Sequence, residues 1–267
     1  MATIVTFHAH PDDEAIATAG TMARYAADGH RVVLVVATRG EHGEVDDGVL
    51  GPGEALWQRR VVETQRAADV LGVARVEFLG YVDSGMAGTA ENDASGSFWA
   101  ADVEEAAARL AAILREERAD VLTVYDENGA YGHPDHIQVH RVGVRAAELA
   151  GTPRVYESTI NRDHLRRLMR ESQDELEVAG QGMPTEDDLG NLGVPEELLT
   201  TCIDARDFVE QKRAAMRAHA SQISETSFFV AMPEERFREV FGYEWFIRRG
   251  APAGTREDDL LADLPTR

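Results

Sequence analysis

Two dense clusters of ionisable residues carry most of the chemistry that this sequence offers. The first reads HAHPDDEA at residues 8–15, and the second reads YDENGAYGHPDHIQVH at residues 125–140. Imidazole and carboxylate groups together suit a zinc-like ion, and three protein ligands with a fourth position open to water are typical of a catalytic metal site. A bound metal lowers the pKa of its water to about 7 and polarises a carbonyl group. The two clusters therefore predict hydrolysis assisted by a metal.

Each cluster taken alone also has a plainer interpretation. A His-Pro-Asp sequence can simply cap a helix, because Asp is a good N-cap residue. In the metal interpretation Asp12 and Asp13 divide the work, since one carboxylate can bind the metal while the other serves as a general base. Asp135 could fix the tautomer of a histidine from behind. Spacing alone does not decide which histidines bind, and the candidates are His8, His10, His133, His136 and His140.

Both clusters directly follow apolar runs that are typical of buried strands. Strand-like and helical patterns alternate through the first half of the chain, which predicts a parallel α/β sheet with right-handed crossovers. The predicted strands are 3–7, 31–38, 75–80, 119–126 and 152–158, and the predicted helices are about 14–27, 55–71, 102–117 and 135–149. In a Rossmann-like sheet of order near 3-2-1-4-5, the first and fourth strands are neighbours, and their carboxyl ends form the ligand crevice. The two clusters should face each other there.

The pattern changes near residue 160. Further helices are predicted over 161–177 and near 206–221, with an aromatic, strand-like segment at 241–249 that could pair between subunits. We interpret residues 1–250 as one domain, with a core of about 1–160 and a C-terminal, substrate-side extension of about 161–250. We expect the remainder, 251–267, to be a loosely ordered tail.

Composition restricts the class of partner. The chain has 267 residues, a formal net charge of -21 and one cysteine, Cys202. Such a charge repels phosphate backbones and anionic lipid surfaces, so we expect no nucleic-acid or membrane partner. No apolar run approaches the ~20 residues that span a membrane, and the N-terminus lacks a signal-peptide pattern. These features favour a cytoplasmic protein that acts on a small molecule, and they leave a homo-oligomer open.

The two motifs together resemble a known family. HAHPDDE at 8–14, taken with GHPDH at 132–136, is similar to the LmbE-like superfamily of zinc-dependent N-deacetylases, which includes the GlcNAc-phosphatidylinositol de-N-acetylases (PIG-L). The similarity extends to GEHGEV (40–45), VDSGMAGT (82–89) and KRAAMRAHASQIS (212–224). These longer matches resemble the actinobacterial branch that deacetylates N-acetylglucosaminyl-inositol in mycothiol synthesis or cleaves mycothiol S-conjugates.

The resemblance implies a metal site and a base. His10, Asp13 and His136 match the ligands of one Zn²⁺ per chain, although Fe²⁺ or Co²⁺ could also occupy a His/His/Asp site. Asp12 matches the general base that takes a proton from the attacking water.

The resemblance also implies three supporting roles. His133 matches a residue that stabilises the oxyanion or protonates the leaving amine, and Asp135 its charge-tuning neighbour. Tyr131 matches a tyrosine that helps to hold the tetrahedral intermediate. His8 has no role in the resemblance, and we interpret it as structural.

Three residues fall where that branch contacts the sugar and inositol hydroxyls: Arg60, Asp83 and Glu44. Each has a plain alternative, because Arg60 could lie on the surface of a charged helix, Asp83 could be a turn former and Glu44 could be solvated. Farther along the chain, His219 is a weaker candidate for the pocket. The aromatic pairs Phe228/Phe229 and Tyr243/Trp245 suit the core better than a sugar platform.

These observations favour a zinc-dependent N-deacetylase that hydrolyses the acetamide of an N-acetylglucosamine-containing small molecule. The alternative is an amidase for mycothiol S-conjugates, which needs a roomier acyl side, and we expect that room near the loop 81–100. A non-catalytic sugar-binding protein of the same fold is the rival class, but it would need neither Asp12 nor His133. Residues 160–200 show no pattern that defines the substrate.

Overall fold

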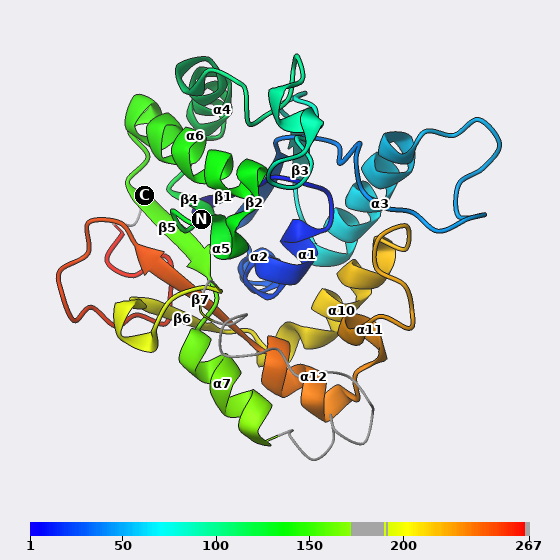
Figure 1. Cartoon of the computed structure of the whole chain (residues 1–267). Helices are drawn as coiled ribbons and strands as arrows, with labels where there is room; N and C mark the ends of the chain where they lie inside the picture. The colour runs from blue at the N-terminus through cyan, green and yellow to red at the C-terminus, as the bar shows by residue number, and fades with distance from the viewer. Residues whose placement is uncertain (172–189, 191, 265–267) are drawn as a thin grey trace.

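The fold is a mixed sheet covered by helices on both faces. The computed structural model describes residues 1–171, 190 and 192–264 (Figure 1). Within these residues the strands are β1 (Thr3–His8), β2 (Arg31–Val36), β3 (Arg75–Phe78), β4 (Val121–Tyr125), β5 (Arg154–Thr159), β6 (Thr201–Asp204) and β7 (Tyr243–Arg248). They form one sheet in the order β3-β2-β1-β4-β5-β7-β6. The predicted order 3-2-1-4-5 is therefore confirmed, and two further strands extend it.

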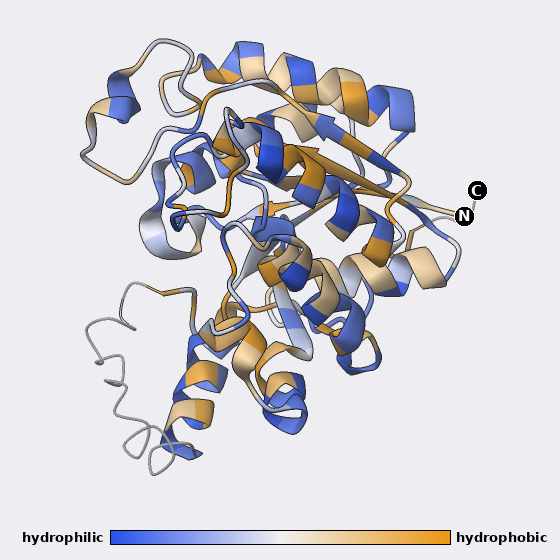
Figure 2. Ribbon diagram, turned by 90° about the vertical axis from the view of Figure 1, so that its right-hand side faces the viewer, coloured by the Kyte–Doolittle hydropathy of each residue, from blue (hydrophilic) through white to orange (hydrophobic). Residues whose placement is uncertain are grey.

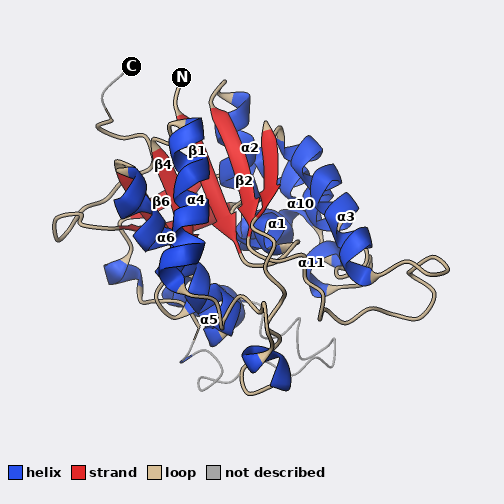
Figure 3. Cartoon of the chain, turned by 90° about the horizontal axis from the view of Figure 1, so that it is seen from above, coloured by secondary structure: helices blue, strands red, loops and turns tan. Residues whose placement is uncertain are grey.

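The helices form a layer on each side of the sheet. They are α1 (Asp13–Ala17), α2 (Ala19–Ala27), α3 (Leu56–Leu71), α4 (Val103–Glu117), α5 (Gly129–Gly132), α6 (Pro134–Ala150), α7 (Arg162–Glu171), α10 (Val209–Ala218), α11 (Phe228–Ala231) and α12 (Glu234–Phe241). Figure 3 shows α4 and α6 on one face and α2, α3 and α10 on the other. No helix in the part of the chain that the structure describes is long and apolar enough to cross a membrane.

The strands in the middle of the sheet are largely apolar on both faces. β2, with the sequence RVVLVV, is buried along all but its first residue, as expected for a parallel strand between two helical layers. One apolar cluster joins the sheet to α2 and α10, and another joins it to α4 and α6. The hydropathy colouring of Figure 2 places orange residues along the strands and on the helix faces that meet them.

The predicted helix over about 14–27 is two helices instead. The helix is interrupted at Thr18, which lies between α1 and α2 and has the non-helical angles φ -135° and ψ 9°. Thr18 is fully buried, and its hydroxyl lies 2.9 Å from Nε2 of His8. The break thus lets a short first helix carry the motif residues while the second packs on the sheet. Apolar spacing alone could not locate this break.

The C-terminal segment differs most from expectation. β7 is not available for pairing between subunits, because it lies antiparallel between β5 and β6 of its own sheet. The segment that we expected to be a loose tail also packs against the fold. Leu260 is fully buried, its N–H donates to the hydroxyl of Tyr25, and Glu257 pairs with Arg248. Of the predicted helix 161–177, residues 172–177 lie outside the described residues.

Candidate metal centre

The two motif clusters meet at the carboxyl end of the sheet, as the strand order predicts. β1 and β4 are parallel neighbours, with Ile4 opposite Val121 and Thr6 opposite Thr123. The first cluster leaves the end of β1 and the second leaves the end of β4. Residues that are more than a hundred positions apart in the sequence therefore surround one point.

Asp13 lies between two histidines at this point. Its Oδ2 is 3.3 Å from Nδ1 of His10 and 3.3 Å from Nε2 of His136. Burial raises the pKa of Asp13, but the two histidines outweigh it and hold that pKa well below its ordinary value. A carboxylate that stays ionised between two imidazoles is a ready metal ligand.

The spacing fits a tetrahedral ion better than a set of direct hydrogen bonds. Ligand atoms about 2.0–2.1 Å from a tetrahedral Zn²⁺ lie about 3.3 Å from one another. Both ring nitrogens of His136 are buried, and neither makes a well-aligned hydrogen bond within the described residues, although Nε2 lies 3.3 Å from Oδ2 of Asp13. A buried imidazole without partners is costly unless something else binds it. The residues present therefore fit a metal ion at His10, Asp13 and His136.

Carboxylates hold His10 from behind. Its Nε2 lies 3.1 Å from Oδ2 of Asp135 and 3.5 Å from Oδ1 of Asp83. Burial lowers the pKa of His10, but hydrogen bonds to Asp13, Asp135 and Asp83 raise it well above its ordinary value. Hydrogen bonding of this kind fixes the ring so that Nδ1 is the nitrogen that faces the ligand position. The Asp135 carboxylate thus contacts His10, whereas the resemblance implies that Asp135 tunes the charge of its neighbour His133.

A second triad is also close enough to bind an ion. The ligand atoms of His10, His133 and His136 lie within 4.8 Å of one another, as do those of His10, Asp83 and Asp135. Asp13 belongs to neither of these two groups. The set His10, Asp13 and His136 accordingly stays a prediction, with His133 as the competing third ligand.

Asp12 sits on an unusual turn beside Arg60. Its φ is 102° and its ψ is -27°, in the left-handed region that non-glycine residues rarely adopt. The side chain makes no capping hydrogen bond to α1, so the plain capping interpretation does not account for it. Its Oδ2 lies 3.4 Å from Nη2 of Arg60. Burial raises the pKa of Asp12 to about 6, against the opposing effect of Arg60.

His133 caps a helix and still presents one nitrogen to the site. It is the N-cap of α6, and its Nδ1 accepts the N–H of Asp135 at 3.1 Å. Burial, with help from His10 and His136, lowers the pKa of His133 to about 4. A neutral ring whose Nδ1 accepts must carry its proton on Nε2. That geometry suits a hydrogen-bond donor to an oxyanion rather than a protonated acid.

Tyr131 projects from a tight loop that packs against His136. Gly129 in this loop has φ 62°, and a Cβ there would come within 2.6 Å of the His136 Cβ. The Tyr131 ring centroid lies 4.9 Å from that of His136, and its side chain is about half exposed. The loop therefore holds a phenol beside His136.

The three predicted substrate contacts occupy different environments. Arg60 is 3% exposed and donates to the backbone carbonyls of Gly40 and Pro11, so it is not a surface residue. Asp83 is buried and accepts the N–H groups of Gly85 and His42 while it faces His10. Glu44 is exposed in the loop before α3. Direct contact of these residues with a substrate stays a prediction.

Sequence reasoning missed a layer of residues behind the predicted ligands. Tyr125 stacks on His136 with ring centroids 4.4 Å apart, and its hydroxyl lies 2.7 Å from Nδ1 of His8. His8 is buried and bonded at both ring nitrogens, which agrees with a structural role. The position of Tyr125 at the end of the strand that precedes the second cluster could have marked it as a candidate. The sequence did not show in which direction its side chain points.

Glu14 and His219 form a buried pair beneath Asp12. Nε2 of His219 lies 2.5 Å from Oε1 of Glu14, and both side chains are fully buried. Burial opposes both charges, yet each partner favours the other, so the pKa of Glu14 is lowered and that of His219 is raised. His219 does not reach the pocket as a free side chain. It supports the motif from the C-terminal extension.

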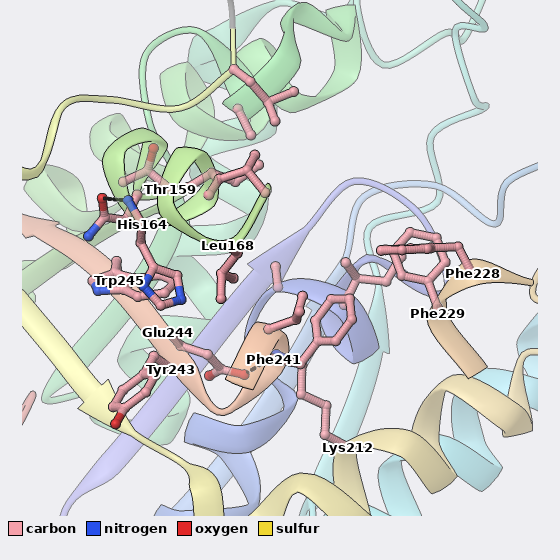
Figure 4. A pocket seen from close by; sticks show the side chains of 18 of the residues that line it. Thr159, His164, Leu168, Lys212, Phe228, Phe229, Phe241, Tyr243, Glu244 and Trp245 are labelled. Atoms are coloured by element: carbon pink, nitrogen blue, oxygen red, sulfur yellow. Dashed lines mark hydrogen bonds and ion pairs between the residues drawn. The ribbon is translucent and has the colours of Figure 1, made fainter. Parts of the chain in front are cut away.

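A cavity of about 920 Å³ opens beside the site (Figure 4). Asp13, Tyr131 and His136 are among its lining residues. Residues of α7, α11, α12 and β7 supply much of the remaining wall, which is largely apolar. Figure 4 shows Phe228 and Phe229 on one side and Trp245 on the other. These aromatic residues therefore line a cavity, where we expected core packing; Phe228 itself is 54% exposed.

Comparison with known proteins gives one family. The model of the family described as GlcNAc-PI de-N-acetylase (PIG-L) matches residues 5–147. A protein of Geodermatophilus obscurus is 40% identical over 98% of this chain and 98% of its own length. One of Acidothermus cellulolyticus is 43% identical over 98% of this chain and 94% of its own length. Both are named 1D-myo-inositol 2-acetamido-2-deoxy-alpha-D-glucopyranoside deacetylase.

Solved structures share the fold at low sequence identity. A deacetylase of the teicoplanin biosynthesis pathway superposes with a TM-score of 0.61 over 94% of this chain and 100% of that chain, at 17% identity. At that identity the likeness supports the architecture alone.

Proposed function

The chain belongs to the GlcNAc-PI de-N-acetylase (PIG-L) family, and from this premise we propose that it is a zinc-dependent N-deacetylase. Its proposed substrate is a small molecule of the glycosyl-inositol type that carries N-acetylglucosamine, and its products are acetate and a free amine. The single observation that carries the proposal is the position of Oδ2 of Asp13, which lies 3.3 Å from Nδ1 of His10 and 3.3 Å from Nε2 of His136. The names of the relatives support the choice of substrate.

We assign the metal to His10, Asp13 and His136. When bound there, the ion supplies positive charge next to the amide carbonyl and makes water acidic enough to attack near neutral pH. Asp135 and Asp83 hold His10 in the orientation that this requires. The unpartnered nitrogens of His136 support the assignment.

We assign the proton transfers to side chains around this position. Asp12 accepts the proton of the attacking water, and a pKa of about 6 suits a base that works near neutral pH. The Nε2–H of neutral His133 donates to the oxygen of the carbonyl as charge develops on it, and the Tyr131 hydroxyl is a second donor beside it. The amine leaves with a proton delivered by protonated Asp12.

The first experiment is a measurement of amine release from N-acetylglucosaminyl-inositol. Protein loaded with Zn²⁺, Fe²⁺ or Co²⁺ is assayed in parallel, because the donor set accepts all three ions. His136→Ala is the control for activity that does not depend on the site. Amine release by the wild type alone supports the proposal. Its absence from protein that still binds one equivalent of metal would contradict the proposed substrate.

The cavity favours a second candidate function, an amidase for substrates with a larger acyl group such as mycothiol S-conjugates. An acetyl group fills only a small part of about 920 Å³. The cavity is lined by residues of α7, α11, α12 and β7 and by none of the loop 81–100, where we expected the room. Asp12, Arg60 and Asp83 are not among the lining residues. In an amidase the acyl group would occupy the cavity, and the sugar would lie on the other side of the proposed metal position.

A matched pair of variants separates the two candidates. Val240 lines the cavity and is half-buried on α12. Val240→Phe narrows the cavity, and Val240→Ala widens it. For an amidase with a large acyl group, kcat/KM for a bulky S-conjugate falls in Val240→Phe and not in Val240→Ala, while acetamide hydrolysis is unchanged in both. Equal effects on both substrates would remove this candidate.

A further inference from the structure

We propose that Glu14 and His219 are positioning residues that hold the turn at Asp12 in its left-handed conformation. They would thereby aim the carboxylate that accepts the proton. This inference rests on the function proposed above, because it concerns the geometry of the proposed base. It assigns a role in that site to a residue of the C-terminal extension.

The turn at Asp12 connects the segment that carries His10 to the helix that carries Asp13. Residues before it carry His10 at the end of β1, and residues after it carry Asp13 on α1. With φ at 102°, Asp12 is one of four non-glycine residues with positive φ among the described residues. A conformation of that kind persists only where the surroundings over-determine it, and such residues cluster at functional sites.

Glu14 binds the backbone of this turn directly. The N–H of Asp12 donates to Oε2 of Glu14 at 3.0 Å. The other oxygen, Oε1, lies 2.5 Å from Nε2 of His219. One oxygen of the Glu14 carboxylate therefore binds the backbone of the turn, and the other is bound by His219. Arg60 adds a second restraint, because it donates to the carbonyl of Pro11 just before the turn.

His219 can restrain Glu14 because it is rigidly placed. It ends α10, and its carbonyl accepts the N–H groups of Gln222 and Ile223 at 2.9 and 2.8 Å. The residue is fully buried and is not among those that line the cavity. It does not line the cavity, and the hydrogen bond that connects it to the Asp12 turn is the one with Glu14. That makes it a positioning residue rather than a catalytic one.

Stability alone is a weak explanation for this pair. Removing two charges from water is costly, and apolar side chains of similar volume often serve stability as well as a buried ion pair does. A nearby carboxylate offers the contrast. Glu63 on α3 is also buried and accepts the N–H and the hydroxyl of Ser221 at 3.0 and 2.6 Å. Glu63 therefore binds the segment that follows α10, close to His219, and makes no hydrogen bond to the Asp12 turn among the described residues.

The test compares variants at these positions in the metal-loaded enzyme. Glu14→Ala removes the acceptor of the Asp12 N–H, and we expect kcat to fall about 100-fold with KM within about twofold, as for a misplaced catalytic group. Glu14→Gln keeps an acceptor oxygen and should recover about tenfold of that loss. His219→Gln keeps a donor at the ε position and should resemble Glu14→Gln. Glu63→Gln is the control, with a lower melting temperature and unchanged kcat.

A second measurement does not depend on turnover or on the metal. Exchange of the Asp12 amide proton, followed by NMR in the full chain, should be at least about tenfold faster in Glu14→Ala and unchanged in Glu63→Gln. The amide of Thr18, which donates to the backbone carbonyl of Glu14 at the C-terminal end of α1, serves as the internal reference. This measurement remains informative if Glu14→Ala is too unstable to assay, because Glu14→Gln and His219→Gln can be measured in the same way.

The outcomes separate this inference from the proposed function. Faster Asp12 exchange together with a specific loss of kcat supports the positioning pair. Unchanged exchange in Glu14→Ala, or a kcat that falls only as far as that of Glu63→Gln, overturns it. If the wild type releases no amine, the proposed function has failed, and amide exchange alone still decides whether the pair holds the turn.

Discussion

The two ends of the same sheet both carry clusters of charge, and the clusters differ in how their charges are paired. At the amino-terminal end, Glu117 of α4 accepts hydrogen bonds from Arg31 and Arg75, the first residues of β2 and β3. The distances are 2.6 and 3.1 Å to Arg31 and 2.8 Å to Arg75. Each charge faces an opposite charge, and both arginines reach solvent.

At the carboxyl end, carboxylates and imidazoles are buried together, and some of their polar atoms have no hydrogen-bond partner among the described residues. Asp12 lies 3.4 Å from Arg60, and neither ring nitrogen of His136 makes a hydrogen bond within the described residues, although its Nε2 lies 3.3 Å from Oδ2 of Asp13. A charge cluster is therefore not in itself a sign of function. The stronger sign is a buried histidine beside a carboxylate with no hydrogen bond at either ring nitrogen, because a buried polar group in that state is costly unless a ligand binds it.

The largest expected effect comes from removing a ligand at the carboxyl end. His136→Ala should reduce bound metal from one equivalent to none and amine release by at least about 10³-fold, because the ion supplies several kcal/mol of stabilisation to the transition state. Metal analysis of the purified protein and the amine assay measure the two effects. A variant that keeps both metal and activity would show that the unpaired nitrogens are not ligands.

Asp12→Ala should separate the base from the metal. We expect kcat to fall about 10³-fold, within the range for general bases, while one equivalent of metal stays bound. The same pair of measurements applies. The non-catalytic interpretation predicts that this variant loses nothing measurable, and loss of metal along with activity would instead make Asp12 a ligand.

His133→Ala distinguishes the two triads that surround His10. If His133 donates a hydrogen bond to the oxyanion, kcat falls about 10²-fold and the metal content is unchanged. If His10, His133 and His136 are the ligands, the metal is lost as well. The metal content of this variant therefore decides between Asp13 and His133 as the third ligand.

The smallest effect is expected at the amino-terminal end. Glu117→Gln should leave amine release unchanged and lower the free energy of unfolding by about 1 kcal/mol or less, as for a partly exposed ion-pair network. Arg31 is the main cause of a Glu117 pKa near 2, compared with 4.5 in the unfolded chain. Because the folded pKa is the lower one, the stabilisation is complete above pH 4.5 and disappears as the pH falls toward 2.

Urea unfolding of the wild type and of Glu117→Gln over that pH range measures this stabilisation as a difference in free energy. The difference should be level above pH 4.5 and shrink below it. A difference that grows on acidification would contradict the assignment, and a loss of activity in Glu117→Gln would break the contrast between the two ends.

Much of the fold was predictable because it follows from local apolar pattern. The runs at β1, β2 and β4 are apolar enough to be buried on both faces, and their alternation with helices leaves few topologies. That order alone brings HAHPDDE and GHPDH to one edge of the sheet. By contrast, β6 is too short and polar for its pattern to be distinctive, and the place of β7 between β5 and β6 depends on long-range pairing.

The residue types of the candidate site also came from the sequence, but their directions did not. A period of two or of 3.6 residues indicates which face of an element is buried; it does not say that Asp83 and Asp135 stand behind His10 or that Tyr125 stacks on His136. The contact between Glu14 and His219 joins residues 205 positions apart. Apolar pattern and strand order thus determine where the chemistry gathers, whereas only the packed structure decides which groups find partners and which are left for a ligand.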